Sequence, residues 1–175
     1  IATDLEIQIA TSIQLDDDYS SEALTISARK TVDILRALPD KTKISLEASE
    51  NRAILKSGKS KFNLQTLPSK DFPLISAKEN AKLDIVKIEQ NVLKDMLQKV
   101  QFSMAQQDIR YYLNGLLLVL EGRTLRLIAT DGHRLAHAST QLKSSAGDRE
   151  TILPRKTVLE LTKLLNDDDA MVEMN

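Results

Sequence analysis

The stretch ATDGHRLA, residues 129 to 136, repeats the opening of ATDLEIQIA, residues 2 to 10, at an offset of 127 positions. A second pair follows each of them. ARKTVDILRALPD begins at residue 28 and PRKTVLELTKLLND begins at residue 154, and their RKTV segments are 126 positions apart. Two independent matches at nearly one offset indicate tandem homologous domains of about 125 residues, an ordinary domain size.

Composition limits the classes of protein that fit. The chain has 175 residues, 42% of them hydrophobic, which is enough for a substantial core. The absence of cysteine excludes disulfides, thiolate zinc sites and cysteine nucleophiles, and a 3% aromatic content argues against base-stacking platforms. No apolar run approaches the roughly 18 residues of a membrane span, and no signal-peptide pattern is present. We therefore expect a soluble cytoplasmic protein without a cofactor and without a membrane partner.

Charge is unevenly distributed along the chain. The net charge of −1 excludes a uniformly basic nucleic-acid binder. Acidic residues concentrate in two expected loops, LDDDYSSE at 15 to 22 and NDDDA at 166 to 170, whereas basic residues recur inside the periodic segments. The distribution therefore suggests local basic surfaces on a chain that is neutral overall.

The first third of the chain has the pattern of a strand, a helix and a meander. Alternation over 4 to 15 predicts a strand, and Ser27 is placed to cap a helix that Pro39 ends. Ala28, Val32, Leu35 and Leu38 share one face of that helix. Period-two alternation then predicts three antiparallel strands, at 43 to 49, 52 to 58 and 60 to 67.

The remainder begins with a linker. Residues 66 to 80 contain two prolines, charges and small polar residues without periodicity, and we place a domain boundary there. A strand at 82 to 88 and a helix follow, the helix with an apolar face of Leu93, Met96, Leu97, Val100 and Met104. Three strands come next, at 113 to 122, 124 to 130 and 133 to 140. A last helix runs from about 155 to 166 after Pro154.

Turn residues connect the expected strands. Glu121 and Gly122 form one turn, and Asp131 with Gly132 predicts a two-residue hairpin that needs positive φ. The pattern as a whole predicts an α+β class, with antiparallel meander sheets and two helices in each repeat. Both ends of the chain lie in alternating stretches, so we expect a piece of a longer protein that interrupts a strand at each end.

The polar faces of the three helices are rich in cations. The residues concerned are Arg29, Lys30 and Arg36 on the first helix, Lys94 on the second, and Arg155, Lys156 and Lys163 on the third. Solvated helix faces carry lysines in most proteins, so any one of these faces needs no function. Three such faces in one chain also suit a phosphate backbone that is contacted without base readout.

The stretch ATDGHRLA admits several interpretations. A catalytic one uses His133 as a base oriented by Asp131 or Asp4, but no nucleophile or oxyanion pocket accompanies them. A metal site would need His133 and His137, which are too far apart on an extended strand. An exposed hairpin explains the Asp and Gly. A shallow apolar pocket rimmed by Thr, His and Arg would also explain the His and Arg that follow, as a docking site for a peptide.

Several longer motifs resemble one family along the whole chain. The motifs are QFSMAQQDIRYYLNGLLL at 101 to 118, LRLIATDGHRLA at 125 to 136, LPRKTVLEL at 153 to 161, TDLEIQI at 3 to 9, ARKTVDILRALP at 28 to 39 and SGKSKFNLQTLPSKDFP at 57 to 73. In collinear order they closely resemble the bacterial sliding clamps, the β subunits of DNA polymerase III. RYYLNG together with ATDGHRLA is highly specific to that family.

The resemblance implies a function without chemistry. In the family, three similar domains per subunit pair head to tail as a homodimer ring, whose helices line a central hole around double-stranded DNA and whose sheets form the outer surface. The ring tethers the replicative DNA polymerase, and a clamp loader opens it with its own ATP. Other clamp-binding repair proteins are further expected partners, and the expected location is the bacterial cytoplasm, on the nucleoid.

The resemblance also implies a domain plan and two sets of site residues. Residues 1 to 67 correspond to the second half of clamp domain 1, 68 to 80 to a linker and 81 to 175 to most of domain 2, with the third domain absent. The partner-peptide pocket corresponds to Leu113, Thr130, Gly132, His133, Arg134 and Leu135. The expected DNA-facing residues are Arg29, Lys30, Arg36, Lys94, Gln107, Arg110, Tyr111, Tyr112, Arg155, Lys156 and Lys163.

One alternative from another class stays open. Asp131 and His133 would serve a phosphate-ester hydrolase on a two-domain scaffold. Loss of turnover, rather than of binding alone, in His133→Ala would favour that enzyme.

Overall fold

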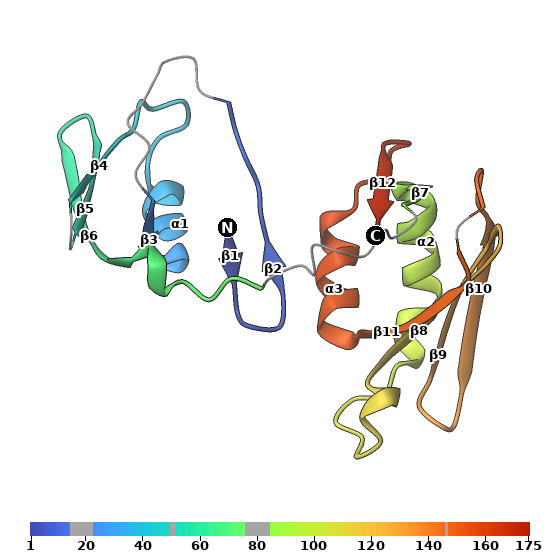
Figure 1. The fold of residues 1–175 in the computed structure, drawn as a ribbon. Coiled ribbons are helices and arrows are strands. Elements are labelled where there is room, and N and C mark those ends of the chain that lie inside the picture. The colour runs from blue at the N-terminus through green and yellow to red at the C-terminus, as the bar shows by residue number, and fades with distance from the viewer. Residues whose placement is uncertain (15–22, 50–51, 76–84, 146) are drawn as a thin grey trace. The chain divides into compact units, whose positions relative to one another are not determined.

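The computed structural model describes residues 1–14, 23–49, 52–75, 85–145 and 147–175. The acidic run at 15 to 22, the second part of the expected linker and residues 82 to 84 of an expected strand lie outside these ranges. The chain divides into two compact units, Ile1–Glu79 and Asn80–Asn175 (Figure 1). Within the described residues no helix is long and apolar enough to cross a bilayer.

The first unit contains a meander and one helix. Its elements are β1 (Ala2–Thr3), β2 (Gln8–Ile9), β3 (Leu24–Ile26), α1 (Ala28–Ala37), β4 (Ser45–Ser49), β5 (Arg52–Ser57), β6 (Ser60–Pro68) and the 3-10 turn η1 (Ser69–Asp71). One antiparallel sheet has the order β3-β6-β5-β4, and β1 pairs with β2. The three strands expected from alternation after the helix are β4, β5 and β6.

The single strand expected over 4 to 15 is wrong, because a tight turn interrupts it. The Asp4 carboxylate accepts hydrogen bonds from the backbone N–H of Glu6 at 3.1 Å and of Ile7 at 3.0 Å. The Thr3 hydroxyl donates to the Ile7 carbonyl at 2.8 Å, and Leu5 has φ of +77°. Local side-chain bonding of this kind competes with extended backbone, and the result is the β1–β2 hairpin.

Helix α1 begins and ends where its capping residues predict. The Ser27 hydroxyl accepts a hydrogen bond from the Lys30 N–H at 3.5 Å, and the helix stops before Pro39. Its apolar stripe is not covered by the described residues, since Val32 is 41% exposed and Leu35 is 40% exposed.

The second unit contains two helices and a four-stranded sheet. Its elements are β7 (Val86–Glu89), α2 (Gln90–Val100), η2 (Gln101–Ser103), η3 (Tyr111–Leu113), β8 (Gly115–Glu121), β9 (Thr124–Thr130), β10 (Leu135–Gln141), β11 (Arg149–Pro154), α3 (Arg155–Leu164) and β12 (Met171–Met174). The sheet order is β10-β9-β8-β11, all antiparallel, and β12 pairs with β7. Helices α2 and α3 pack on the same side of this sheet (Figure 1).

The core of the second unit forms between those helices and the sheet. The apolar face expected for the second helix is buried, with Leu93, Met96, Leu97 and Val100 each at most 3% exposed. Alternate sheet residues, among them Leu116, Leu125 and Leu127, meet that face. Met104 is also buried, but it follows η2, because α2 ends at Val100 rather than continuing to it.

The second unit differs from the expectations in three further ways. Strand β11 carries no clear alternation and was not predicted from the sequence. Strand β8 begins at Gly115, so Leu113 lies in η3 instead of in the strand. The β9–β10 turn has four residues, 131 to 134, instead of two, and His133 and Arg134 belong to the turn.

The internal repeat has a structural counterpart in the two ATD turns. Asp131 accepts from the backbone N–H of His133 and of Arg134, both at 3.0 Å, and the Thr130 hydroxyl donates to the Arg134 carbonyl at 2.7 Å. Each of these bonds has its equivalent 127 positions earlier, at Asp4 and Thr3. Gly132, with φ of +89°, stands where Leu5 has φ of +77°. Helices α1 and α3 begin and end at the same offset of 127.

Candidate functional site

The turn between β9 and β10 is held by its own side chains. Two backbone N–H groups, of His133 and Arg134, point at the Asp131 carboxylate and lower its pKa, with a smaller contribution from the Arg134 side chain. The Arg134 Nε donates to Asp131 at 2.9 Å, and its guanidinium lies 5.5 Å from the centre of the Phe102 ring. His133 and Arg134 are thus presented from a turn of fixed shape.

A second loop, residues 105 to 114, lies beside this turn and is also rigid. Its base is closed by a hydrogen bond from the Ala105 N–H to the Leu113 carbonyl at 2.9 Å. The Asn114 side chain accepts from the Asp108 N–H at 3.0 Å and donates to the Asp108 carbonyl at 2.8 Å. The described loop is therefore fixed at its base and across its middle.

Arg110 joins the loop to the turn. Its Nε and Nη2 donate to the Asp108 carboxylate at 3.0 and 2.9 Å, and this pairing lowers the pKa of Asp108 to about 2. The same guanidinium lies against Gly132, where an added Cβ would be 3.3 Å from Nη2 and 3.5 Å from Nη1. The turn can approach the guanidinium this closely because Gly132 has no side chain.

A polar hollow of about 360 Å³ lies between the loop, the turn and the start of α3. Its acidic and basic lining residues are Asp108, Arg110, Asp131, His133, Arg134 and Arg155. Of the six residues expected in the partner-peptide pocket, only His133 and Arg134 line it. Thr130 ends β9, Gly132 belongs to the turn, Leu113 ends η3, and Leu135 begins β10 with 67% of its surface exposed.

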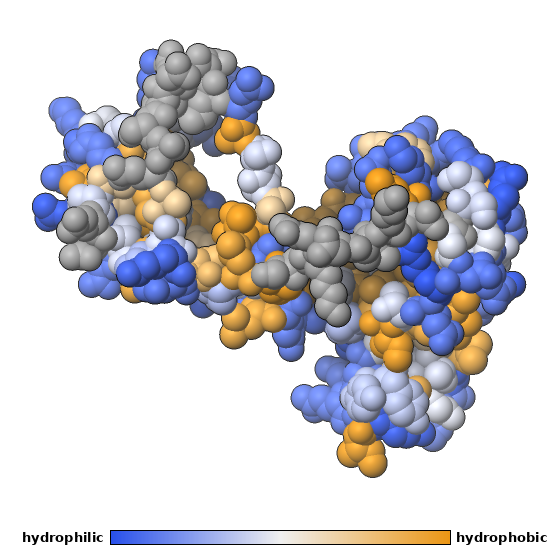
Figure 2. All heavy atoms as spheres, in the orientation of Figure 1, coloured by the Kyte–Doolittle hydropathy of each residue, from blue (hydrophilic) through white to orange (hydrophobic). Residues whose placement is uncertain are grey.

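The outer end of the loop is apolar and aromatic. Ile109 is 97% exposed, Tyr111 82% and Tyr112 50%, and the two tyrosine rings meet edge to face at 5.9 Å. This loop is the lowest part of the second unit in Figure 1, and Figure 2 shows hydrophobic atoms at its lower end. Gln107 has φ of +58°, a left-handed conformation uncommon for a residue with a side chain.

The expected DNA-facing cations differ in their surroundings. Arg29, Lys30 and Arg36 are exposed on α1, and Lys156 and Lys163 are exposed on α3, with Lys163 2.7 Å from Glu160. Arg155 is half-buried and donates to the Met104 carbonyl at 3.3 Å. The Lys94 side chain is only 17% exposed and lies 2.9 Å from Asp167 in the loop after α3, so it is largely shielded from solvent.

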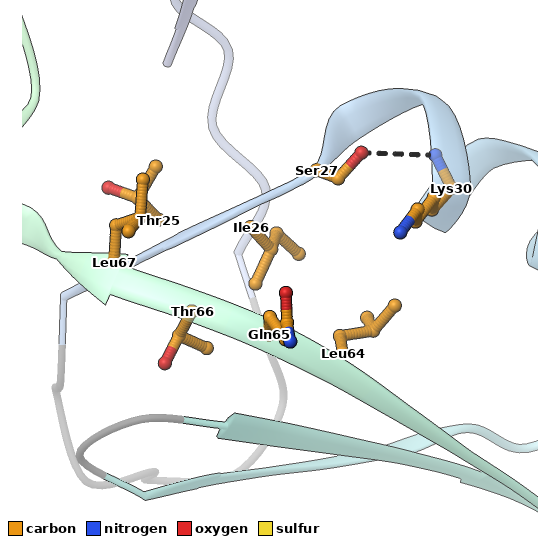
Figure 3. Close-up of a pocket in the computed structure, with 8 residues that line it drawn as sticks. All are labelled: Thr25, Ile26, Ser27, Lys30, Leu64, Gln65, Thr66 and Leu67. Atoms are coloured by element: carbon orange, nitrogen blue, oxygen red, sulfur yellow. Dashed lines mark hydrogen bonds between the residues drawn. The ribbon is translucent and has the colours of Figure 1, made fainter.

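A feature that the sequence analysis missed is a hollow of about 460 Å³ in the first unit, between the start of α1 and β6 (Figure 3). Its lining combines the apolar Ile26, Leu64 and Leu67 with Ser27 and Lys30. Strand β6 pairs with β5 along Ser60–Gln65 but with β3 only from Thr66 to Pro68. The edge of β6 beside α1 therefore has no pairing strand among the described residues. No local sequence pattern reveals this unpaired edge.

The geometry gives no support to the catalytic interpretation of the turn. Both oxygens of Asp131 are engaged by backbone N–H groups or by Arg134, and none of the described bonds joins Asp131 to the His133 side chain. Within the described ranges, no group of three or more His, Cys, Asp or Glu residues could hold a metal ion.

Comparison with known families matches both units in chain order. Residues 1–76 match the model of the DNA polymerase III beta subunit, N-terminal domain, and residues 87–175 match that of the central domain. A beta sliding clamp of Vibrio cholerae is 45% identical over 166 residues, which are 94% of this chain and 44% of the relative. That of Escherichia coli K12 is 40% identical over 167 residues, 95% of this chain and 45% of the relative.

Solved structures give the same result. A crystal structure of the DNA polymerase III subunit beta from Pseudomonas aeruginosa has a TM-score of 0.85 and 41% identity, covering 91% of this chain and 43% of that one. A DNA polymerase sliding clamp from Caulobacter crescentus has a TM-score of 0.77 and 35% identity, covering 86% and 42%. The chain thus spans less than half the length of the relatives that it matches.

Proposed function

This chain belongs to the family of bacterial DNA polymerase III β subunits, the sliding clamps, and we propose that it acts as part of a ring that encircles duplex DNA. The observation that carries the proposal is the repeat. Two matched turns and two matched helices recur at one offset of 127 residues, in a chain whose two halves match successive domains of the family. Similar domains that are joined in the same way can close into a symmetric ring.

We propose that the helices and the loop 105 to 114 face the DNA. The exposed cations of α1 and α3 suit phosphates, and the loop presents Tyr111 and Tyr112 on a rigid base. Arg110, Gln107 and Arg155 belong to the same surface. Contacts of this type are independent of base sequence and weaken with salt, as a protein that slides along DNA requires.

We propose that the replicative polymerase, the clamp loader and clamp-binding repair proteins bind at the β9–β10 turn, through an extended peptide. The support is the rigid presentation of His133 and Arg134 beside the exposed Leu135. One Caulobacter crescentus clamp is described with polyethylene glycol bound to a putative beta-motif tethering region, and a Pseudomonas aeruginosa clamp with bound griselimycin. Thr130, Gly132 and Leu113 complete the proposed site.

Ring closure would use a second copy, head to tail. The unpaired edge of β6 beside α1 supports this part of the proposal, because an unpaired strand edge with apolar neighbours favours pairing with another strand.

In the proposed domain plan, 1 to 67 is the second half of clamp domain 1, 68 to 80 a linker and 81 to 175 most of domain 2. The proposed location is the bacterial cytoplasm, on the nucleoid.

A hydrolase is not a competing proposal. The relatives are named as clamps, and Asp131 is occupied as a turn residue in the same way as Asp4, which has no histidine beside it. We propose that the ring holds DNA topologically and performs no reaction of its own.

The experiment uses the full-length protein with a clamp loader and ATP. Its retention on nicked circular DNA is measured by gel filtration before and after a restriction enzyme linearises the circle. Loss on linearisation is expected, because a ring slides off free ends. Equal retention on circular and linear DNA would show ordinary charge-driven binding and would contradict the proposal.

A further inference from the structure

The sheet of the second unit has an outer face that the helices do not cover. Leu116, Leu118, Leu125 and Leu127 point toward α2 and α3 and are buried, so their neighbours along β8 and β9 point the other way. An antiparallel sheet with one face in water normally carries polar residues on that face. A continuous apolar stretch there would need an explanation.

One row of residues across this outer face is largely apolar. In the register of the sheet, Ile152 lies opposite Leu117, Leu117 opposite Ile128, and Ile128 opposite His137. Ile152 is 45% exposed, Leu117 and Ile128 are half-buried, and His137 is exposed at the edge strand. We call these four residues the outer apolar row.

The next row of the same face is different. It consists of Glu150, Val119, Arg126 and Ser139, and Arg126 is ion-paired with Glu121. On this side the outer apolar row is therefore bounded by a row of mixed polarity. A narrow apolar row suits an extended chain better than a broad protein surface.

The outer apolar row is continuous with the β9–β10 turn. Thr130 and Leu135 lie opposite each other, two residues along their strands from Ile128 and His137. A spacing of two places them on the same face, about 7 Å away. The row thus begins where the proposed partner-peptide site ends, and Leu135 is exposed between the two.

We propose that the outer apolar row binds apolar side chains that flank the core motif of a partner peptide, an inference that rests on the proposed function of the turn. The row spans three strand spacings, about 14 Å, which four to five residues of extended peptide cover. Because Arg126 is already paired with Glu121, the row selects flanks with alternating aliphatic residues and not acidic ones.

The test measures peptide binding to the full-length protein by fluorescence anisotropy. Five peptides are used: a short segment of the replicative polymerase, that segment extended by Leu-Ser-Leu-Ser at one end or at the other, and the two corresponding extensions made of four serines. The double variant L117T/I128T removes the aliphatic centre of the row. Val119→Thr, half-buried on the same face of β8 but one row away, is the matched control.

The leucine extension at one end is expected to raise affinity about tenfold over the serine extension, the effect of covering two aliphatic side chains. L117T/I128T should abolish that gain and leave the short peptide unaffected, while Val119→Thr changes neither. The inference would be overturned if the leucine extension raised peptide affinity at neither end. It would also be overturned if the double variant lost affinity equally for the short and the extended peptides. In both cases the proposed pocket would still stand. Failure of the wild-type protein to bind any probe would overturn both.

Discussion

The guanidinium of Arg110 lies against Gly132, so close that a Cβ on the glycine would stand 3.3 Å from Nη2. Arg110 belongs to the loop that we place against DNA, and Gly132 to the turn that we place against partner peptides. Asp108 fixes the guanidinium with two charge-assisted hydrogen bonds. Both surfaces therefore depend on one ion pair and one missing side chain.

Gly132→Ala is expected to weaken partner-peptide binding several-fold, because the new methyl group strains the turn at φ +89° and displaces Arg110. Gly122→Ala is the matched control, since Gly122 has φ of +57° and a Cβ added there would meet no atom within 4 Å. Both changes should lower the free energy of unfolding by about 1 kcal/mol. Denaturant unfolding and peptide titration separate the two effects, and equal peptide affinity in both variants would contradict the Arg110 contact.

Asp108 should titrate with a pKa of about 2 in an NMR titration of its carboxyl carbon. Its folded pKa lies below the ordinary 3.8, so its stabilisation is present above about pH 4 and is lost as the pH falls toward 2. In Arg110→Leu the pKa should rise toward 3.8, because the Arg110 side chain is the main cause of the shift. Asp131 should move less in Arg134→Leu, since backbone N–H groups dominate there. Equal movement of the two carboxyl groups would contradict this assignment.

Gly115→Ala should destabilise the second unit more than Gly122→Ala does. A Cβ at Gly115 would be 2.4 Å from the Leu153 carbonyl oxygen, a backbone atom that moves only with β11. We expect a loss of about 1–3 kcal/mol in the free energy of unfolding, the usual cost of overpacking. Urea unfolding of the two variants tests this. Similar unfolding midpoints would show that β11 moves aside at little cost in free energy.

Charge reversal on α3, with Lys156→Glu and Lys163→Glu together, should weaken direct binding to linear duplex DNA, measured without the clamp loader. The slope of log K against log salt is negative, and each phosphate contact that is lost should make it shallower by about 0.9. Lys59→Glu, in the exposed β5–β6 turn, is the control and should leave the slope unchanged. An unaltered slope in the α3 variant would place that helix away from the DNA.

Arg134→Ala and Leu135→Ala together should weaken polymerase and loader peptides while leaving the ring itself intact. Arg134 loses its bond to Asp131 and its contact with Phe102, and Leu135 loses an exposed apolar surface. The expected decrease in peptide affinity is at least about tenfold, typical of truncating residues at the centre of an interface. Arg52→Ala on β5 serves as the control for an exposed arginine. Unchanged peptide affinity would show that the turn is not part of the peptide-binding site.

Much of the fold followed from local patterns. The Ser27 cap and Pro39 set the limits of α1, and alternation located β4, β5 and β6, because these signals depend on neighbours in the chain. Strand β11 was not predicted because it has no clear alternation of apolar and polar residues. Its place at the sheet edge comes from pairing with β8. The two ATD turns were misjudged for a related reason, since Asp4 and Asp131 form turns with their own backbone.

The sequence alone determined the repeat, the family resemblance and the cationic helix faces, since each is a property of residue order and spacing. It could not determine that Lys94 is shielded beside Asp167, that Arg110 rests on Gly132, or that Ile152, Leu117 and Ile128 form one row. Those relationships join residues that are distant in the chain. They arise only when strands pair in a given register and helices pack, which fixes side-chain neighbours that no local pattern encodes.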